Sequence, residues 1–282
     1  MKKKILALAI AAIMVVTAVA SVSLAYLMDT DEATNVFTVG YIDIELIEQQ
    51  RNSAGNALEP FADGKILLPL VGSAQGEKVE VDGYSLPTAA NWVDKIVDVK
   101  NVGNNDAYVR VVLAFPAAMD DKESAAEMML HWNVDGTENE NNWERVDNGA
   151  KVTVDGVEYN LYTFTYNPIL AVKAKTASPA MTGLYIDSRV NASVTKDDNG
   201  KVTAITYSMK NGRGETASAT FSADTDGNIV GPQILVSVQA VQADGFETVG
   251  AAVALDTAFG AITATNNPYV INYPSNPETT AN

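Results

Sequence analysis

The chain has no cysteine and only one histidine among its 282 residues. The absence of cysteine excludes a disulfide framework and thiolate chemistry, so the fold has to be held together by its core. A single histidine, His131, excludes zinc motifs that need a histidine pair, and its apolar neighbours favour a packing role. No G-x-S-x-G motif surrounds a serine, and the many acidic residues lie mostly in turns, where solvated charge is usual. We therefore predict no catalytic residue, no metal site and no cofactor, and a protein that is not an enzyme.

Basic residues are also scarce. The chain has 19 lysines and arginines against 35 acidic residues, a formal net charge of −16. A surface this acidic repels phosphate backbones and anionic lipid, so nucleic acid is not an expected partner. The hydrophobic share of 47% is that of an ordinary globular chain and is enough for a sizeable core.

The first 25 residues have the pattern of a secretory signal peptide. Lys2, Lys3 and Lys4 form a basic start, and residues 5–20 are apolar except for one threonine. Ser23 and Ala25 then supply the small residues at −3 and −1 that a signal peptidase recognises. Cleavage there takes the net charge from −16 to −19, because three lysines are lost and no acid is.

Two alternatives remain at this end of the chain. Residues 18–20 offer a second cleavage site, and residues 5–25 carry no charge and would nearly span a bilayer as an uncleaved anchor. Cleavage after Ala25 is favoured because the small residues stand where the peptidase needs them. We expect a secreted protein that begins at Tyr26 and resides in the extracellular matrix or at the cell surface.

Most of the remaining sequence has the two-residue period of β-strands. In residues 41–48, Ile42, Ile44 and Leu46 alternate with acidic residues, which is typical of a half-buried strand. The other predicted strands are 92–100, 107–115, 157–166, 184–194, 202–209, 216–223 and 234–241.

Turn residues separate these strands. Residues 101–106 are rich in Asn, Gly and Asp, and residues 198–200 and 226–228 have the composition of hairpin turns. Asp197–Gly200 and Asp224–Asn228 also resemble calcium loops, but in the second the glycine comes too early for an EF-hand and Leu235 stands at the twelfth ligand position. Hairpin turns are the favoured interpretation, and calcium binding stays open.

Helical patterns are few, at residues 120–130 and more weakly at 246–259. Many short strands with polar turns predict an all-β fold, a jelly-roll-like β-sandwich with one or two short helices in the connections. Residues 40–265 would form this domain. Residues 266–282, with three prolines and several Asn and Thr, are predicted to be a flexible tail.

Three segments resemble a known family. They are residues 25–44, residues 97–110 and residues 238–246. In the first, an alanine at the cleavage site is followed at fixed offsets by Asp29, Phe37, Gly40 and Asp43. This pattern is similar to the start of TasA and camelysin-like proteins, which are exported with a signal peptide processed by a SipW-type signal peptidase. The three segments cover about a sixth of the chain, and residues 116–230 match nothing in the family.

The resemblance implies a biofilm matrix protein that forms fibres by donor-strand complementation. Residues 26–39 would be the donor segment that adds as a strand to the sheet of a neighbouring subunit. Phe37 would be its buried anchor, and residues 41–47 the first strand of the subunit's own sheet. The donor residues that the resemblance singles out are Tyr26, Leu27, Asp29, Phe37 and Val39.

The resemblance also implies partners. These are further copies of the chain in a head-to-tail homopolymer, the SipW-type signal peptidase during export, and other matrix proteins. A head-to-tail joint does not close on itself and so propagates as a filament. Without the family pattern, residues 26–39 would be interpreted as a floppy N-terminus. The alternative function is a secreted monomeric adhesin or binding domain on the same scaffold.

Overall fold

The structure is a computed structural model. It describes residues 28–32, 35–38, 42–61, 71–72, 77–88, 92–120, 129–132, 142–210, 214, 216–223 and 233–270. Within them the chain is an all-β sandwich with one short helix, which confirms the predicted fold class. The predicted signal peptide and its predicted cleavage site lie outside the described residues.

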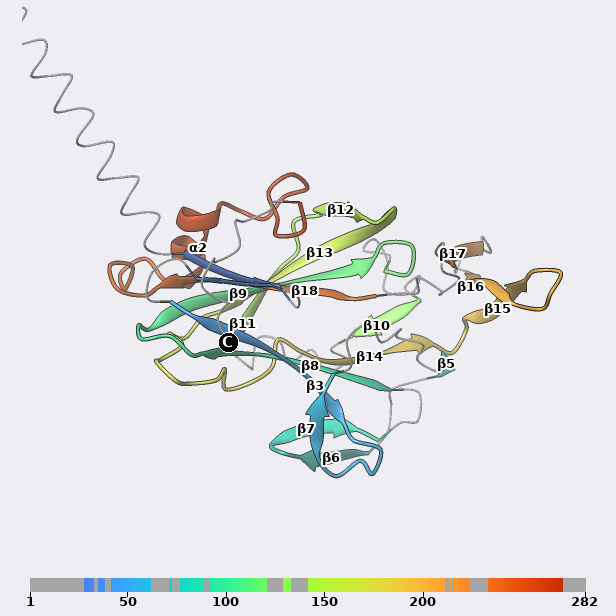
Figure 1. Ribbon diagram of the computed structural model, residues 1–282, viewed down its shortest axis with the longest axis horizontal. Coiled ribbons are helices and arrows are strands. Elements are labelled where there is room, and N and C mark those ends of the chain that lie inside the picture. The colour runs from blue at the N-terminus through green and yellow to red at the C-terminus, as the bar shows by residue number, and fades with distance from the viewer. Residues whose placement is uncertain are drawn as a thin grey trace, which may run out of the picture.

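Two antiparallel sheets form the sandwich (Figure 1). The larger has the strand order β11-β13-β9-β18-β1-β2, with β12 also paired to β13. Its strands are β1 (Met28–Glu32), β2 (Asn35–Thr38), β9 (Ala107–Pro116), β11 (Trp143–Val146), β12 (Lys151–Val154), β13 (Val157–Tyr166) and β18 (Leu235–Gln242).

The smaller sheet faces it, with the order β10-β14-β8-β3-β4 and with β5 parallel to β14. Its strands are β3 (Ile44–Arg51), β4 (Leu58–Pro60), β5 (Val71–Gly72), β8 (Val93–Asn101), β10 (Leu130–Trp132) and β14 (Met181–Asp187).

The main core fills the space between these sheets. Ile42 and Ile44 are at most 1% exposed and Leu46 packs partly buried against the core, so the predicted inward face is confirmed. Burial alternates only over residues 42–45, because residues 46–51 are all of intermediate exposure. The strand itself begins at Ile44 rather than at residue 41. Trp92, Trp132 and Trp143 are all buried, as expected of sandwich aromatics.

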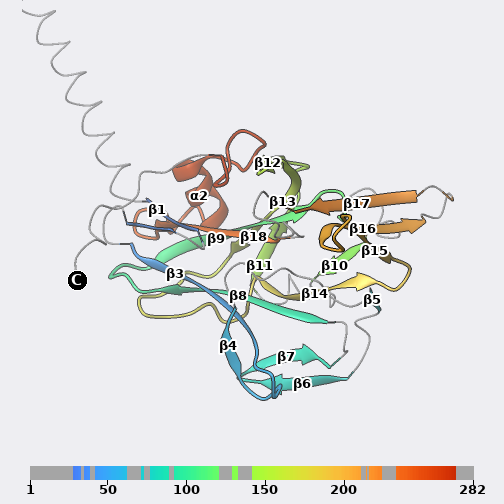
Figure 2. The same cartoon turned by 45° about the vertical axis from the view of Figure 1, so that its right-hand side comes forward.

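Two smaller sheets project from the sandwich. The hairpin of β6 (Lys78–Val81) and β7 (Tyr84–Pro87) lies beneath it, and the sheet of β15 (Asn191–Lys196), β16 (Val202–Lys210) and β17 (Thr216–Ser222) extends from one end (Figures 1 and 2). The predicted turn at 198–200 joins β15 to β16. The Asp197 carboxylate stabilises it by accepting hydrogen bonds from the amides of Asn199 and Lys201, each at 2.9 Å.

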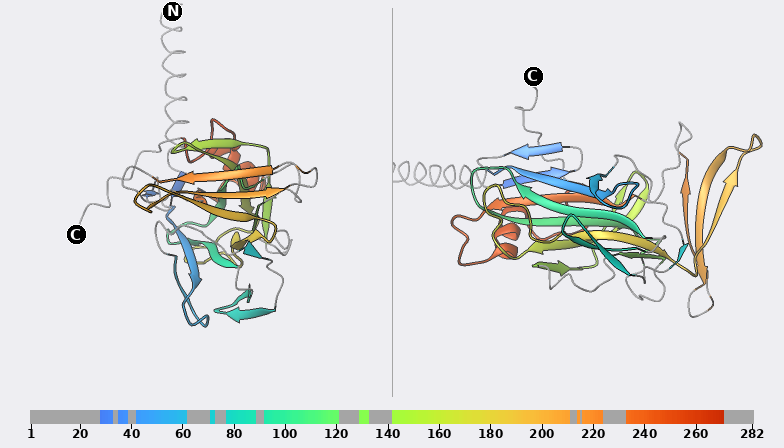
Figure 3. Two further views of the ribbon diagram at one scale, coloured as in Figure 1. Left: turned by 90° about the vertical axis from the view of Figure 1, so that its right-hand side faces the viewer. Right: turned by 90° about the horizontal axis from the view of Figure 1, so that it is seen from below.

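The three-stranded sheet lies at the opposite end of the molecule from β1, β2 and the helix α2 (Ala251–Phe259) (Figure 3). The helix packs on the outer face of the larger sheet through Ala254 and Leu255, which are fully buried against β9 and β18. The predicted helix at 246–259 is helical only from Ala251 to Phe259, and residues 246–250 precede it as a turn segment.

Four local expectations are corrected. The first is the end of the predicted helix at 120–130. Leu130 is the first residue of β10, and its amide, like that of Met129, donates to the carbonyl of Met119. Residues 121–128, most of the predicted helix, lie outside the described residues. The second is the run 184–194, which is two strands separated by a turn at 188–190.

The third concerns β17 and β18. They do not pair with each other, so 226–228 is not a hairpin turn between them, and that segment lies outside the described residues. The fourth is the tail. Residues 266–270 are not a loose segment: Asn267 is 1% exposed, and the Tyr269 hydroxyl donates to the carbonyl of Val112 at 2.5 Å. Residues 271–282 are outside the described residues.

Candidate functional site at the edge of the larger sheet

The predicted donor segment forms two strands at the edge of the larger sheet. β1 runs antiparallel to β18 over five positions, from Met28 opposite Val241 to Glu32 opposite Ser237. β2 folds back on β1 over four positions, which leaves β2 at the edge. The segment is therefore not a floppy N-terminus: in a single chain it adds to the chain's own sheet.

β18 provides a fixed template for this strand. It pairs with β9 over eight positions on its other side, and residues 236–241 are all buried. Val238 and Ala240 belong to the main core, whereas Val241 packs under the helix. Because both faces of β18 are packed, its edge toward β1 keeps its shape, and an added strand meets a preformed row of amides and carbonyls.

A buried arginine holds the outer face of this template. Arg110 on β9 is 2% exposed and donates from Nε to Oε1 of Gln239 at 2.7 Å. Its Nη1 donates to Asp256 at 2.7 Å and its Nη2 to the carbonyl of Gly260 at 2.8 Å, at the C-terminal end of α2. A cation there is stabilised by the helix dipole. One side chain thus joins β9, β18 and the helix.

The structure places only some of the predicted site residues. Asp29 lies opposite Ala240 and Phe37 lies opposite Thr30 in the backbone register. Ile42, Ile44 and Leu46 lie in or against the core, as described above. The predicted residues outside the described ranges are Ser23, Ala25, Tyr26, Leu27 and Val39.

The turn segment of the second resembling region is also ordered. Asn101 is fully buried, and its Nδ2 donates to the carbonyls of Asn105 at 2.8 Å and Leu170 at 3.0 Å. Asn105 donates to Gln242 at the end of β18 at 3.0 Å. Residues 101–106 therefore connect β8 to β9 as predicted. They also contact the end of β18, the strand with which β1 pairs.

His131 lies away from this edge, in β10. Its Nε2 is 3.1 Å from Oδ2 of Asp187, and its ring stacks on Tyr185 with centroids 4.9 Å apart. Asp187 also receives Nε and Nη2 of Arg189 at 2.8 and 2.9 Å, and these bonds hold the pKa of its carboxyl below the ordinary value. The histidine is thus a hydrogen-bonded, stacked side chain.

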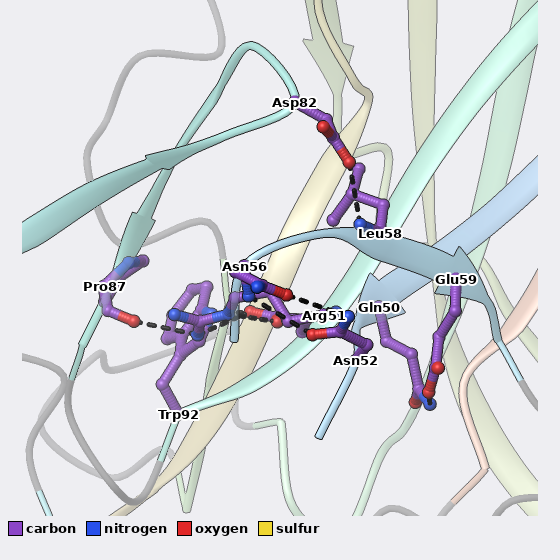
Figure 4. Close-up of polar contacts among 10 residues, drawn as sticks. Gln50, Arg51, Asn52, Asn56, Leu58, Glu59, Asp82, Pro87 and Trp92 are labelled. Carbon is purple, nitrogen blue, oxygen red and sulfur yellow. Dashed lines mark hydrogen bonds and ion pairs between the residues drawn. The ribbon is translucent and has the colours of Figure 1, made fainter. Parts of the chain in front are cut away.

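A largely buried ion pair between Arg51 and Asp94 fixes the junction of β3, β7 and β8 (Figure 4). Arg51 donates from Nε to Asp94 at 2.5 Å and from Nη2 to the carbonyl of Pro87 at 2.9 Å. The Trp92 indole donates to the other oxygen of Asp94 at 2.9 Å. Nearby, the Leu58 amide donates to Asp82 at 2.8 Å. These bonds attach the β6–β7 hairpin to the sandwich, so we assign them a structural role.

The described residues contain no group of three or more His, Cys, Asp or Glu side chains placed to hold a metal ion. Nor does any described helix have the length and apolar character needed to cross a membrane. The segment 224–228, one of the two calcium-like loops, lies outside the described residues. In the other loop the Asp197 carboxylate accepts main-chain amides, as a turn requires.

Comparison with protein-family models, curated proteins and solved structures found no match to this chain. The resemblance to TasA and camelysin-like proteins therefore stays a prediction from three short segments.

Proposed function

We propose that the chain is a structural subunit of an extracellular biofilm matrix fibre, and that it polymerises when the N-terminal segment of one subunit adds to β18 of the next. The observation that carries the proposal is the five-position register between β1 and β18. A strand that fits this edge within one chain fits the identical edge of a neighbour equally well. Exchange of identical elements between copies is a low-cost route to assembly.

The energetics allow a linear polymer. Each β1 that leaves its own sheet exposes one row of main-chain groups, and each neighbour's β1 covers the same row, so these bonds nearly balance. What remains is the additional contact between adjacent subunits. A subunit that donates its segment at one side and accepts another at β18 is joined head to tail. The chain contains no cysteine, so disulfides cannot hold such joints together. Their durability would come from the many main-chain hydrogen bonds in register.

Export is part of the same proposal. The mature chain would be released by a SipW-type signal peptidase, assemble outside the cell with itself and with other matrix proteins, and require no cofactor. Residues 1–25 carry the signal for this route.

The second candidate is a secreted monomeric adhesin or binding domain. One observation favours it: β1 and β2 are accommodated within a single chain, so the sheet is complete without a partner. The two functions differ in whether the segment leaves β18.

Negative-stain imaging and sedimentation of the secreted protein test the proposal. We expect filaments from the wild type and none from a variant that lacks residues 26–39. The deletion uncovers the β18 edge but leaves the core residues Ile42 and Ile44 in place, so circular dichroism should still report a folded β protein. A synthetic peptide of residues 26–39 should occupy the free edge and slow growth of wild-type filaments. Wild-type protein that stays monomeric in every condition would favour the adhesin.

A further inference from the structure

The strand β15 forms an edge with unusual properties for so acidic a chain. It pairs with β16 on one side, and it stands first in the order of the three-stranded sheet, at the end of the molecule remote from β1 (Figure 3). All six of its residues are exposed. At its centre Val194 is 55% exposed, the highest value for a large hydrophobic side chain among the residues the structure describes.

Charge distinguishes this edge. β15, β16 and β17 contain two lysines, Lys196 and Lys210, and no acid, in a chain with a net charge of −16. Two copies of the chain repel each other over most approaches, and least where the surface carries no acid. A second copy therefore meets little electrostatic resistance along these three strands, whereas the turn that joins β15 to β16 carries Asp197 and Asp198 beside Lys201.

Three other edge strands among the described residues carry features that discourage pairing. β4 ends in Pro60, β6 has Lys78 and Glu80, and β11 has Glu144 beside Arg145. Proline, alternating charge and short length are the usual protections of a sheet edge. The only charge in β15 is Lys196, at its last position. At the opposite edge of the same sheet, β17 has alternate residues buried, so it is less accessible than β15.

We propose that β15 is a self-association surface, at which two copies of the chain pair antiparallel about a two-fold axis and form one continuous six-stranded sheet. In the register centred on Val194, the two Val194 side chains lie opposite each other and shield one another from water. Lys196 then lies opposite Ala192 of the second copy, so the two lysines stand at opposite ends of the joint and do not repel. Such an isologous joint closes after two copies.

The joint is separate from the donor-strand joint of the proposed function. It uses a different sheet, at the other end of the molecule, and needs no movement of β1. If both joints form, β15 would connect filaments in pairs. If only the β15 joint forms, the product would be a discrete dimer.

A single introduced cysteine tests the proposal, because the chain has none of its own. Directly opposed residues of an antiparallel pair have Cα atoms about 4.5–5.5 Å apart, within the range of a disulfide. Val194→Cys in the secreted protein should therefore form a covalent dimer on mild oxidation. Val253→Cys, on the exposed side of α2 with 52% exposure, is the matched control and should stay monomeric under the same conditions.

A second variant measures the same joint without oxidation. Val194→Lys places two like charges opposite each other, and we expect it to raise the dimer dissociation constant at least about tenfold. Val253→Lys should leave this constant unchanged. Sedimentation velocity over a concentration series provides the measurement.

Equal cross-linking of the two cysteine variants, or no cross-linking of Val194→Cys, would overturn the proposal. So would a dimer that Val194→Lys does not weaken. These outcomes are independent of the proposed function. Filaments without a Val194→Cys dimer would contradict only the β15 proposal. A dimer without filaments would contradict only the fibre proposal.

Discussion

Arg110 on β9 and Gln239 on β18 are joined by a 2.7 Å hydrogen bond, and both residues are at most 2% exposed. Gln239 also lies opposite Thr30 of β1 in the strand register. The arginine thus supports, from the neighbouring strand, the position at which the N-terminal segment is held. The edge that we propose for assembly is fixed by a contact that spans 129 positions of sequence.

Removing this arginine should weaken the fold. Arg110→Met removes one hydrogen bond of the buried Gln239 side chain and the link to Asp256 and the end of α2. Because Asp256 is half exposed, the loss of stability is smaller than for a fully buried pair. We expect the free energy of unfolding to fall by about 2–3 kcal/mol. Lys100→Met is the control, since its pair with Glu45 is exposed on both sides and should contribute less than about 1 kcal/mol. Urea unfolding measures both, and equal losses would refute the assignment.

Gly183 in β14 should not tolerate even a methyl group. A Cβ there would lie 2.3 Å from the carbonyl oxygen of Val93 and 2.7 Å from the ring of Trp92. We expect Gly183→Ala to destabilise the protein by about 1–3 kcal/mol, because the Val93 carbonyl belongs to the paired strand β8 and the indole is held in place by its bond to Asp94. At Gly200, which has φ +81° but open space around it, alanine should cost only about 1 kcal/mol of backbone strain. Thermal unfolding of the two variants would contradict this account if Gly183→Ala were the milder.

The ionisation of Asp187 should make the free energy of unfolding depend on pH. Its hydrogen bonds to Arg189 and His131 lower its pKa in the folded state relative to the unfolded chain. The stabilisation is therefore present above the unfolded pKa of about 3.9 and is lost as pH falls toward the folded value. Asp187→Asn should be less stable than wild type at pH 7, and the difference in free energy of unfolding between the two proteins should narrow below about pH 4. A gap that is constant from pH 7 to pH 2 would contradict the proposed cause.

Processing should release a chain that begins at Tyr26. Ser23 and Ala25 occupy the −3 and −1 positions, and large side chains there are not accepted by signal peptidases. Ala25→Phe should therefore block this cut, and Ala20→Phe should not. Intact-mass analysis of secreted protein measures the outcome. A product that begins at Ser21 would shift the start of the donor segment, and retention of Met1 would mean an anchored protein.

The sequence predicts the strands far better than their partners. Val157–Tyr166 coincides with the predicted strand, and the alternation of Ile42 and Ile44 identifies core positions correctly. Periodicity reports which face of a strand is apolar, but it does not report which strand lies beside it. For this reason the expected hairpin between 216–223 and 234–241 was wrong: the two strands belong to different sheets.

Local turn chemistry explains most of the other differences. Val190 donates its amide to the carbonyl of Asp187 at 3.0 Å, and this turn interrupts the predicted strand 184–194. Asp82-Gly83 and Asp155-Gly156, both with positive φ, close the β6–β7 and β12–β13 hairpins. The Asp-Gly dipeptide is a hairpin signal that could have predicted them.

The candidate site was predictable only in part. The resemblance indicated residues 26–39, but nothing in the sequence shows that they pair with β18 of the same chain. Arg110 and Asp256 are 146 positions apart and carry no motif, so their ion pair had no signal in a single sequence. Such contacts depend on the final arrangement of strands, which local pattern does not determine.

Glu32 and Ser237 allow the most direct test of the central claim. They are opposed in the β1–β18 register, so cysteines at both positions are within reach of a disulfide. Thr30→Cys with Ser237→Cys is the control, because diagonal neighbours are about 7–8 Å apart. Filaments of each variant are oxidised and dissolved in detergent without reductant. Donor-strand addition predicts a ladder of covalent multimers from Glu32→Cys with Ser237→Cys and none from the control. Filaments that yield only internally bridged monomers would contradict it, because β1 would then have stayed on its own subunit.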